Sequence, residues 1–299
     1  MMASAMKIAT LAHIGAVSLS CMVLGATADA AALIQPSGID LAPHRAIYEL
    51  KLDRANSGSN VASLTGFLVI EFTGSACEGY VQNTKLLTKS TDWTGAETVT
   101  DMRASNWEGG RGESFRFNSV RYFNDVLSET IEGSAKRETS RDSITLTFKK
   151  PAAGTAKIPG DSLFPTQHII AILKSAMEGK FVLQANIFDG LEKDEKIYET
   201  NTVIGKAVAP GSAASLPPVA NAEVLSDLVS WPVSISYFEP GKGQDAAPSY
   251  EIAYRLYSNG VSRKLHIDYG SFSIEGDLSM IEFLKANPCP KGPNKPVRR

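Results

Sequence analysis

Apolar and polar residues alternate with a period of two along most of the chain. In the segment 46–53, Tyr48, Leu50 and Leu52 fall on one face of an extended chain, and charged residues fall on the other. A strand with one apolar and one polar face is typical of an antiparallel sheet that covers a core on one side. The same pattern recurs at 143–149, 229–237 and 265–274.

Other segments rich in β-branched and aromatic residues predict further strands, and turn residues separate several of them. These segments lie near 62–73, 79–90, 97–107, 114–123, 126–137, 181–188, 196–205 and 250–258. A dozen or more strands at this spacing predict an all-β fold, in the form of a barrel, a sandwich or a sheet wound up on itself.

Three local signals refine the strand map. Asn259-Gly260 favours a type I′ hairpin turn, which needs a positive φ at both central positions. Gly133 falls inside a predicted strand and indicates a bulge. Pro232 cannot donate a hydrogen bond to a neighbouring strand, so it indicates an edge strand or a bulge.

One segment breaks the alternation and predicts a helix. Pro165 suits the first turn of a helix, where its missing N–H costs nothing, and Gly179 marks the end. The apolar residues between them recur at helical spacing: Ile169, Ile170, Leu173, Ala176 and Met177. Such a helix has one apolar stripe, suited to plugging or capping a sheet. A second short helix near 279–286 is left open, and 207–222 and 239–248 are expected to be surface loops.

The first thirty residues have the pattern of a secretory leader. Lys7 precedes a nearly uncharged apolar run over 8–27, and the small-x-small triplet 28–30 predicts cleavage after it. An uncleaved membrane anchor is the alternative. We therefore expect a signal peptide over 1–30 and a single periplasmic domain over 31–299 that ends in a basic tail.

Two cysteines, Cys77 and Cys289, remain after the leader. In an oxidising compartment such a pair favours a disulfide over a metal site, because zinc needs three or four Cys or His ligands. Free thiols or redox switching is the alternative. The chain-entropy model gives the bond an upper value of about 5 kcal/mol, because the closed loop is long. We expect the bond to act as a clasp that holds distant ends of the wound-up sheet together.

Few residues suggest catalysis. The chain has no phosphate-binding loop, no G-x-S-x-G segment and no H-E-x-x-H segment. His44, His168 and His266 are far apart. His266 is expected to face water, His168 to have a packing or capping role, and His44 to be a structural or an exposed loop histidine. A Ser/His/Asp triad could be assembled from any chain of this length, so it carries little weight. We therefore expect no catalytic, cofactor-binding or metal-binding residues.

Charge and composition limit the classes of partner that the protein is expected to bind. The net charge of −2 gives no electrostatic basis for binding nucleic acid. No stretch after the leader approaches the ~20 apolar residues of a transmembrane helix. The acidic stretch 189–195 lacks calcium-loop spacing and is expected to be a solvated turn. Core packing is expected for Trp93, Trp107 and Trp231, with a ligand-lining role as the alternative.

Several short segments together resemble the periplasmic cell-envelope-integrity proteins of the EipB type, formerly a domain of unknown function. They are 41–48 (LAPHRAIY), 131–133 (IEG), 163–168 (LFPTQH), 187–190 (IFDG) and 265–270 (LHIDYG). The resemblance covers nearly the whole chain after the leader, and the two cysteines fall where that family has its disulfide pair. It implies an antiparallel β-spiral with a helix, a periplasmic location and a contribution to envelope integrity under stress. It implies no established enzymatic activity or ligand.

These observations leave three functional hypotheses. The first is a non-enzymatic periplasmic protein that supports the cell envelope by binding an envelope protein or lipid component. The alternative is a carrier of an apolar ligand, such as a lipid or a lipoprotein acyl chain, in a concave sheet lined by aromatic residues. A second alternative, an envelope hydrolase, rests only on the presence of Ser, His and Asp.

Overall fold

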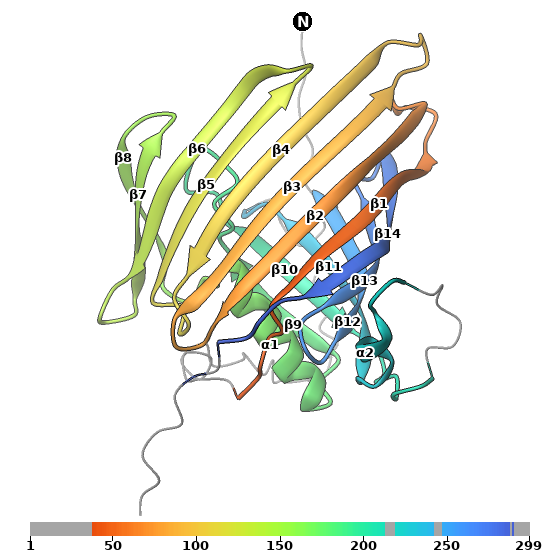
Figure 1. Ribbon diagram of the computed structural model, residues 1–299. Helices are drawn as coiled ribbons and strands as arrows, with labels where there is room; N and C mark the ends of the chain where they lie inside the picture. Colours follow the sequence, from red (N-terminus) through yellow and green to blue (C-terminus); the bar gives the residue numbers. More distant parts are fainter. Residues whose placement is uncertain (1–37, 213–218, 242–246, 288, 290–299) are drawn as a thin grey trace, which may run out of the picture.

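The computed structural model describes residues 38–212, 219–241, 247–287 and 289. Fourteen strands form one sheet in which every neighbouring pair is antiparallel (Figure 1). The strands are β1 (His44–Ala55), β2 (Ser63–Ser75), β3 (Gly79–Thr91), β4 (Glu97–Glu108), β5 (Ser114–Phe123), β6 (Val126–Arg137), β7 (Ser143–Lys150), β8 (Gly154–Pro159), β9 (Val182–Ile187), β10 (Tyr198–Ile204), β11 (Ser230–Phe238), β12 (Tyr250–Tyr257), β13 (Ser262–Asp268) and β14 (Phe272–Phe283). The helices are α1 (Pro165–Met177) and α2 (Glu223–Ser226).

The sheet consists of two halves joined in its middle. Strands β1 to β8 follow one another as neighbours, as do strands β9 to β14, and β1 pairs with β14 to connect the halves. The edge strands β8 and β9 do not pair, so the sheet stays open. Figure 1 shows the first half lying in front of the second, as expected for a sheet that winds up on itself. The predicted all-β class and open, barrel-like architecture are therefore confirmed.

Helix α1 fills one end of the space between the halves. It begins with Pro165, as predicted, and nine of its residues are buried. Ile170, Ile172 and Leu173 pack with Phe72 and Tyr80 of the first half, and residues of β9 to β12 complete this core cluster. The predicted plugging role is confirmed. No helix in the described part of the chain has the length and apolar composition that a membrane crossing requires.

The structure resolves one open element, adds two that were not predicted and corrects the place of Pro232. The open question near 279–286 is settled by β14, which continues to Phe283 as a strand because it pairs with β1 along its length. Strand β8 and helix α2 were not predicted. Pro232 lies in an interior strand, not at an edge, and its carbonyl accepts a hydrogen bond from the N–H of Gly205 just beyond the end of β10.

The turns also differ in part from the prediction. The hairpin at Asn259-Gly260 is not type I′, because only Gly260 has a positive φ (86°). A two-residue turn with two positive φ values occurs instead at Asn124-Asp125, between β5 and β6. The predicted bulge at Gly133 is present, and a Cβ there would lie 2.5 Å from the ring of Phe117.

The Cys77–Cys289 disulfide is present, with the two Cα atoms 5.5 Å apart. It joins the turn between β2 and β3 to the segment after β14. Only β1 separates β2 from β14, so the bond ties together neighbours in the middle of the sheet. The open edges are β8 and β9, and the disulfide does not bridge them. The interpretation as a clasp that closes the wound-up sheet is therefore wrong.

Candidate functional site

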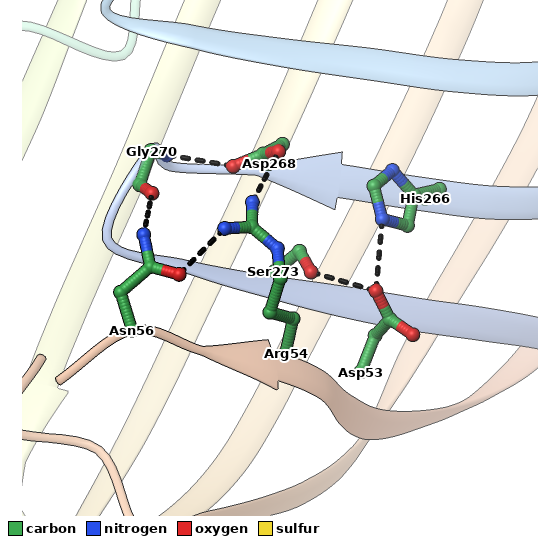
Figure 2. A network of polar contacts seen from close by, with 7 residues as sticks. All are labelled: Asp53, Arg54, Asn56, His266, Asp268, Gly270 and Ser273. Carbon is green, nitrogen blue, oxygen red and sulfur yellow. Dashed lines mark hydrogen bonds and ion pairs between the residues drawn. The ribbon is translucent and has the colours of Figure 1, made fainter.

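A polar network on the outer face of the sheet brings together a serine, a histidine and an aspartate from three strands (Figure 2). The Asp53 Oδ2 atom lies 3.2 Å from Nε2 of His266 and accepts a hydrogen bond of 2.8 Å from the Ser273 hydroxyl. Both hydrogen bonds lower the pKa of Asp53, and the bond from Ser273 has the larger effect. His266 is partly exposed, as predicted.

The order of the three groups does not suit nucleophilic catalysis. A catalytic histidine must lie between the serine, whose proton it takes, and the carboxylate that orients it. Here the carboxylate lies between the other two groups. Ser273 is also fully buried. The network therefore has no activated serine.

The neighbouring contacts indicate a structural role. Arg54 pairs with Asp268 at 2.8 Å and donates to Asn56 at 2.7 Å. The Asn56 amide donates to the carbonyl of Gly270, and the N–H of Gly270 donates to Asp268. As Figure 2 shows, these contacts join the end of β1 to the turn between β13 and β14. They fasten the two halves of the sheet at the end away from α1.

A groove of about 670 Å³ lies beside this network, on the same outer face. Its residues come from β14, β1, β2, β3 and β4: Glu49, Leu50, Lys51, Thr65, Gly66, Phe67, Leu87, Thr88, Lys89, Val99 and Asp277. Phe67 is 50% exposed within it. Charges of both signs border the groove and largely pair with one another, for example Lys51 with Glu275 at 3.1 Å. It offers an apolar floor without an excess of either charge.

A buried carboxylate holds the start of α1. Glu108 ends β4, and its carboxylate accepts hydrogen bonds from the backbone N–H groups of Thr166 at 2.7 Å and Gln167 at 3.0 Å. A negative group at a helix N-terminus is stabilised by the unpaired N–H groups and the helix dipole. Burial nevertheless raises the pKa of Glu108 to about 7. Glu108 was not predicted as a site residue, because the predicted strand 97–107 ends one residue before it.

Arg137 completes this anchor. Its guanidinium donates to the carbonyl oxygens of Gly112, Gly160 and Ser162 and lies 5.5 Å from the ring centre of Phe164, just before α1. These contacts connect β6 to the segment that leads into the helix. They position α1, and each of the three guanidinium nitrogens donates to a backbone carbonyl oxygen.

The other two histidines are buried and lie apart from this outer-face network. His44 begins β1, and its Nδ1 atom lies 2.7 Å from the carbonyl oxygen of Ala42. His168 is on α1; its Nε2 atom contacts no hydrogen-bonding partner among the described residues, and burial lowers its pKa to about 4. The described residues include no group of three or more His, Cys, Asp or Glu able to hold a metal ion.

The tryptophans differ from one another. Trp231 is buried in the core, as predicted. Trp107 is half-buried, with the guanidinium of Arg116 4.2 Å from its ring centre. Trp93 is 65% exposed, so its predicted core packing is wrong; its indole N–H donates to the carbonyl oxygen of Ser59.

An aromatic row on the inner face of the second half was not predicted from the sequence. Tyr237 and Tyr250 are cross-strand partners whose rings stack 4.4 Å apart. Tyr198 meets both rings edge-on, and Tyr269 extends the row from Tyr250 to Phe272. Their alternation with outward-facing polar residues was visible in the sequence. The row itself depends on strand neighbours that the sequence does not specify.

Comparisons with known proteins identify the family. The EipB-like family model matches residues 35–285. The cell envelope integrity protein EipB of Brucella abortus (strain 2308) is 36% identical over 248 residues, which cover 82% of this chain and 85% of that protein. A crystal structure of a beta-barrel-like protein of a domain of unknown function (DUF1849) from Brucella abortus has a TM-score of 0.75 and 34% identity. It covers 83% of this chain and 100% of that one. The chain therefore belongs to the EipB-like family.

Proposed function

We propose that this protein supports the integrity of the bacterial cell envelope from the periplasm, as a non-enzymatic protein that binds an envelope component. The observation that carries the proposal is the likeness to the Brucella abortus cell envelope integrity protein over 82% of the chain. The secretory pattern of residues 1–30 and the disulfide suit an oxidising compartment outside the cytoplasm.

The arrangement of polar groups supports binding over catalysis. The serine of the Asp53–His266–Ser273 group is buried and does not contact the histidine. Glu108 and Arg137 are occupied in holding α1. By contrast, the outer groove and the inner aromatic row present side chains that no described element covers completely.

The proposal predicts an envelope phenotype that depends on export. A strain that lacks the gene should grow normally on plain agar and poorly on agar with deoxycholate or a β-lactam. The full-length chain should restore growth, whereas a chain without residues 1–30 should not. Normal growth of the deletion strain under both stresses would contradict the envelope role.

Variants of the Asp53–His266–Ser273 group test whether the protein acts by binding or as a hydrolase. His266→Ala and Ser273→Ala should each complement the deletion fully, provided that immunoblots show normal protein levels. Loss of complementation by both variants at normal levels would overturn the non-enzymatic part of the proposal.

A further inference from the structure

The inner face of the first half is unusually polar at the end away from α1. On β3 and β4 the inward positions carry Thr84, Thr88, Ser90, Thr98 and Thr100, next to the apolar Leu86 and Met102. All of them are half-buried, whereas Tyr80 and Ala104, nearer α1 on the same face, are buried. A face made only to pack a core would carry apolar residues there. The hydroxyl groups therefore border solvent-accessible space inside the sheet.

The aromatic row forms the facing wall. Tyr237 and Tyr250 are half-buried, and Tyr269 is 41% exposed. Because Tyr237 and Tyr250 stack on each other, one face of each ring is occupied, and the edges and hydroxyl groups remain for other contacts. The hydroxyls of these three tyrosines have no hydrogen-bond partner among the described residues. Buried or half-buried hydroxyls normally find one.

One ring contact joins the two walls: Phe117 on β5 and Phe188 after β9 meet edge-on at 5.5 Å. Burial raises the pKa of Tyr237 and Tyr250, and the carboxylate of Asp189, the residue after Phe188, contributes to the same shift. Farther from α1, Arg121 on β5 pairs with Glu129 at 3.2 Å, so this ion pair adds no net charge. The interior at this end is thus rich in hydroxyl groups, is bordered by aromatic rings and carries the acidic Asp189.

We propose that the two inner walls at the end away from α1 bind a neutral oligosaccharide. The inference rests on the proposed function and names the class of envelope component. A sugar chain offers hydroxyl groups to pair with those of threonine and tyrosine, and C–H groups to contact the ring edges. An acyl chain would leave these hydroxyls without partners, at a cost in free energy. An anionic ligand would be repelled by the Asp189 carboxylate, whereas a neutral sugar can donate hydroxyl hydrogen bonds to it.

The test measures binding of the purified, disulfide-bonded chain to neutral chito-, malto-, cello- and manno-tetraoses by isothermal titration calorimetry. We expect at least one of them to bind. Removing one hydroxyl by Tyr250→Phe or Thr100→Val should weaken that binding about three- to tenfold, as expected for one hydrogen bond. The matched outer-face variants Tyr122→Phe and Thr130→Val lie outside the groove and should leave it unchanged.

The results that would overturn the inference can be told apart from those that would overturn the proposed function. Binding of none of the four sugars, or equal weakening by the inner and outer variants, overturns the oligosaccharide inference. Saturable binding of a fluorescent fatty acid that Tyr250→Phe leaves unchanged or strengthens, without sugar binding, would assign an acyl ligand instead. In either case the envelope role would still stand if the full-length gene complements its deletion, so the two failures can be told apart.

Discussion

The two ends of the space inside the sheet are built differently. At the end that α1 fills, inward side chains such as Tyr80 and Phe115 are buried, and Glu108, Arg137 and the disulfide fasten the elements together. At the opposite end the inward side chains are half-buried hydroxyls and tyrosines, several without partners. We therefore expect the end filled by α1 to contribute most to the free energy of unfolding and the opposite end to contribute most to binding and function.

The largest expected effect comes from the disulfide at the α1 end. The bond closes a loop with a sequence separation of 212 residues. Its removal should lower the free energy of unfolding by up to about 5 kcal/mol, because the unfolded chain gains freedom. Urea denaturation of wild-type protein with and without dithiothreitol, and of the double variant Cys77→Ser/Cys289→Ser, measures this. Equal stability in all three states would contradict a stabilising role of this end.

The next effect is a pH dependence of the free energy of unfolding, in which the contributions of two buried groups oppose each other in the wild-type protein. Burial raises the pKa of Glu108 from 4.5 to about 7, so the folded state holds its proton more tightly and stability falls as pH rises through that range. Burial lowers the pKa of His168 from 6.5 to about 4, so stability falls as pH drops through that range. Each slope is about 1.4 kcal/mol per pH unit. Between pH 4.5 and 6.5 the two slopes oppose each other.

Replacing either group alone should therefore reveal the pH dependence of the free energy of unfolding that comes from the other. In Glu108→Gln the His168 slope remains, and the free energy of unfolding should rise by about 3 kcal/mol from pH 4.5 to 6.5 relative to wild type. In His168→Leu the sign should reverse, with a fall of similar size. Urea titrations at four pH values provide the data. Parallel pH profiles for wild type and both variants would show that these groups do not titrate as described.

The smallest effect on stability is expected at the open end. Tyr269→Ala and Thr88→Val remove groups that are exposed or half-buried, so each should change the free energy of unfolding by less than about 1 kcal/mol. Thermal unfolding followed by circular dichroism is sufficient to measure this. A loss comparable to that of the disulfide would make the open end part of the structural core and remove the contrast between the two ends.

Much of the fold could be predicted because alternation and helical spacing are local signals. The strand containing Tyr48, Leu50 and Leu52 and the helix that begins at Pro165 are examples. Strand β8 escaped because Thr155 and Lys157 lie at a polar sheet edge with little apolar contrast. The end of β14 was left open because its strand character comes from pairing with β1, which is distant in sequence.

The site was less accessible to sequence reasoning. The pairing of Cys77 with Cys289 could be predicted, but not its place beside β1, which follows from strand order. The alignment of Tyr237 with Tyr250 likewise follows from the register of β11 and β12. Core packing was expected for Trp93 because it stands beside predicted strands, but it lies in the loop between β3 and β4 and is exposed. The local alternation predicts on which face of a strand a residue lies, whereas the pairing register between strands determines which residues lie next to it.

The most direct measurement is complementation of the deletion strain by matched double variants at equal protein levels. Tyr250→Phe/Thr100→Val removes two inner hydroxyls at the open end, and Tyr122→Phe/Thr130→Val removes the same groups from the outer face. We predict that the inner variant fails to restore growth on deoxycholate and that the outer variant restores it fully. Equal growth of both strains would contradict the assignment of function to the open end.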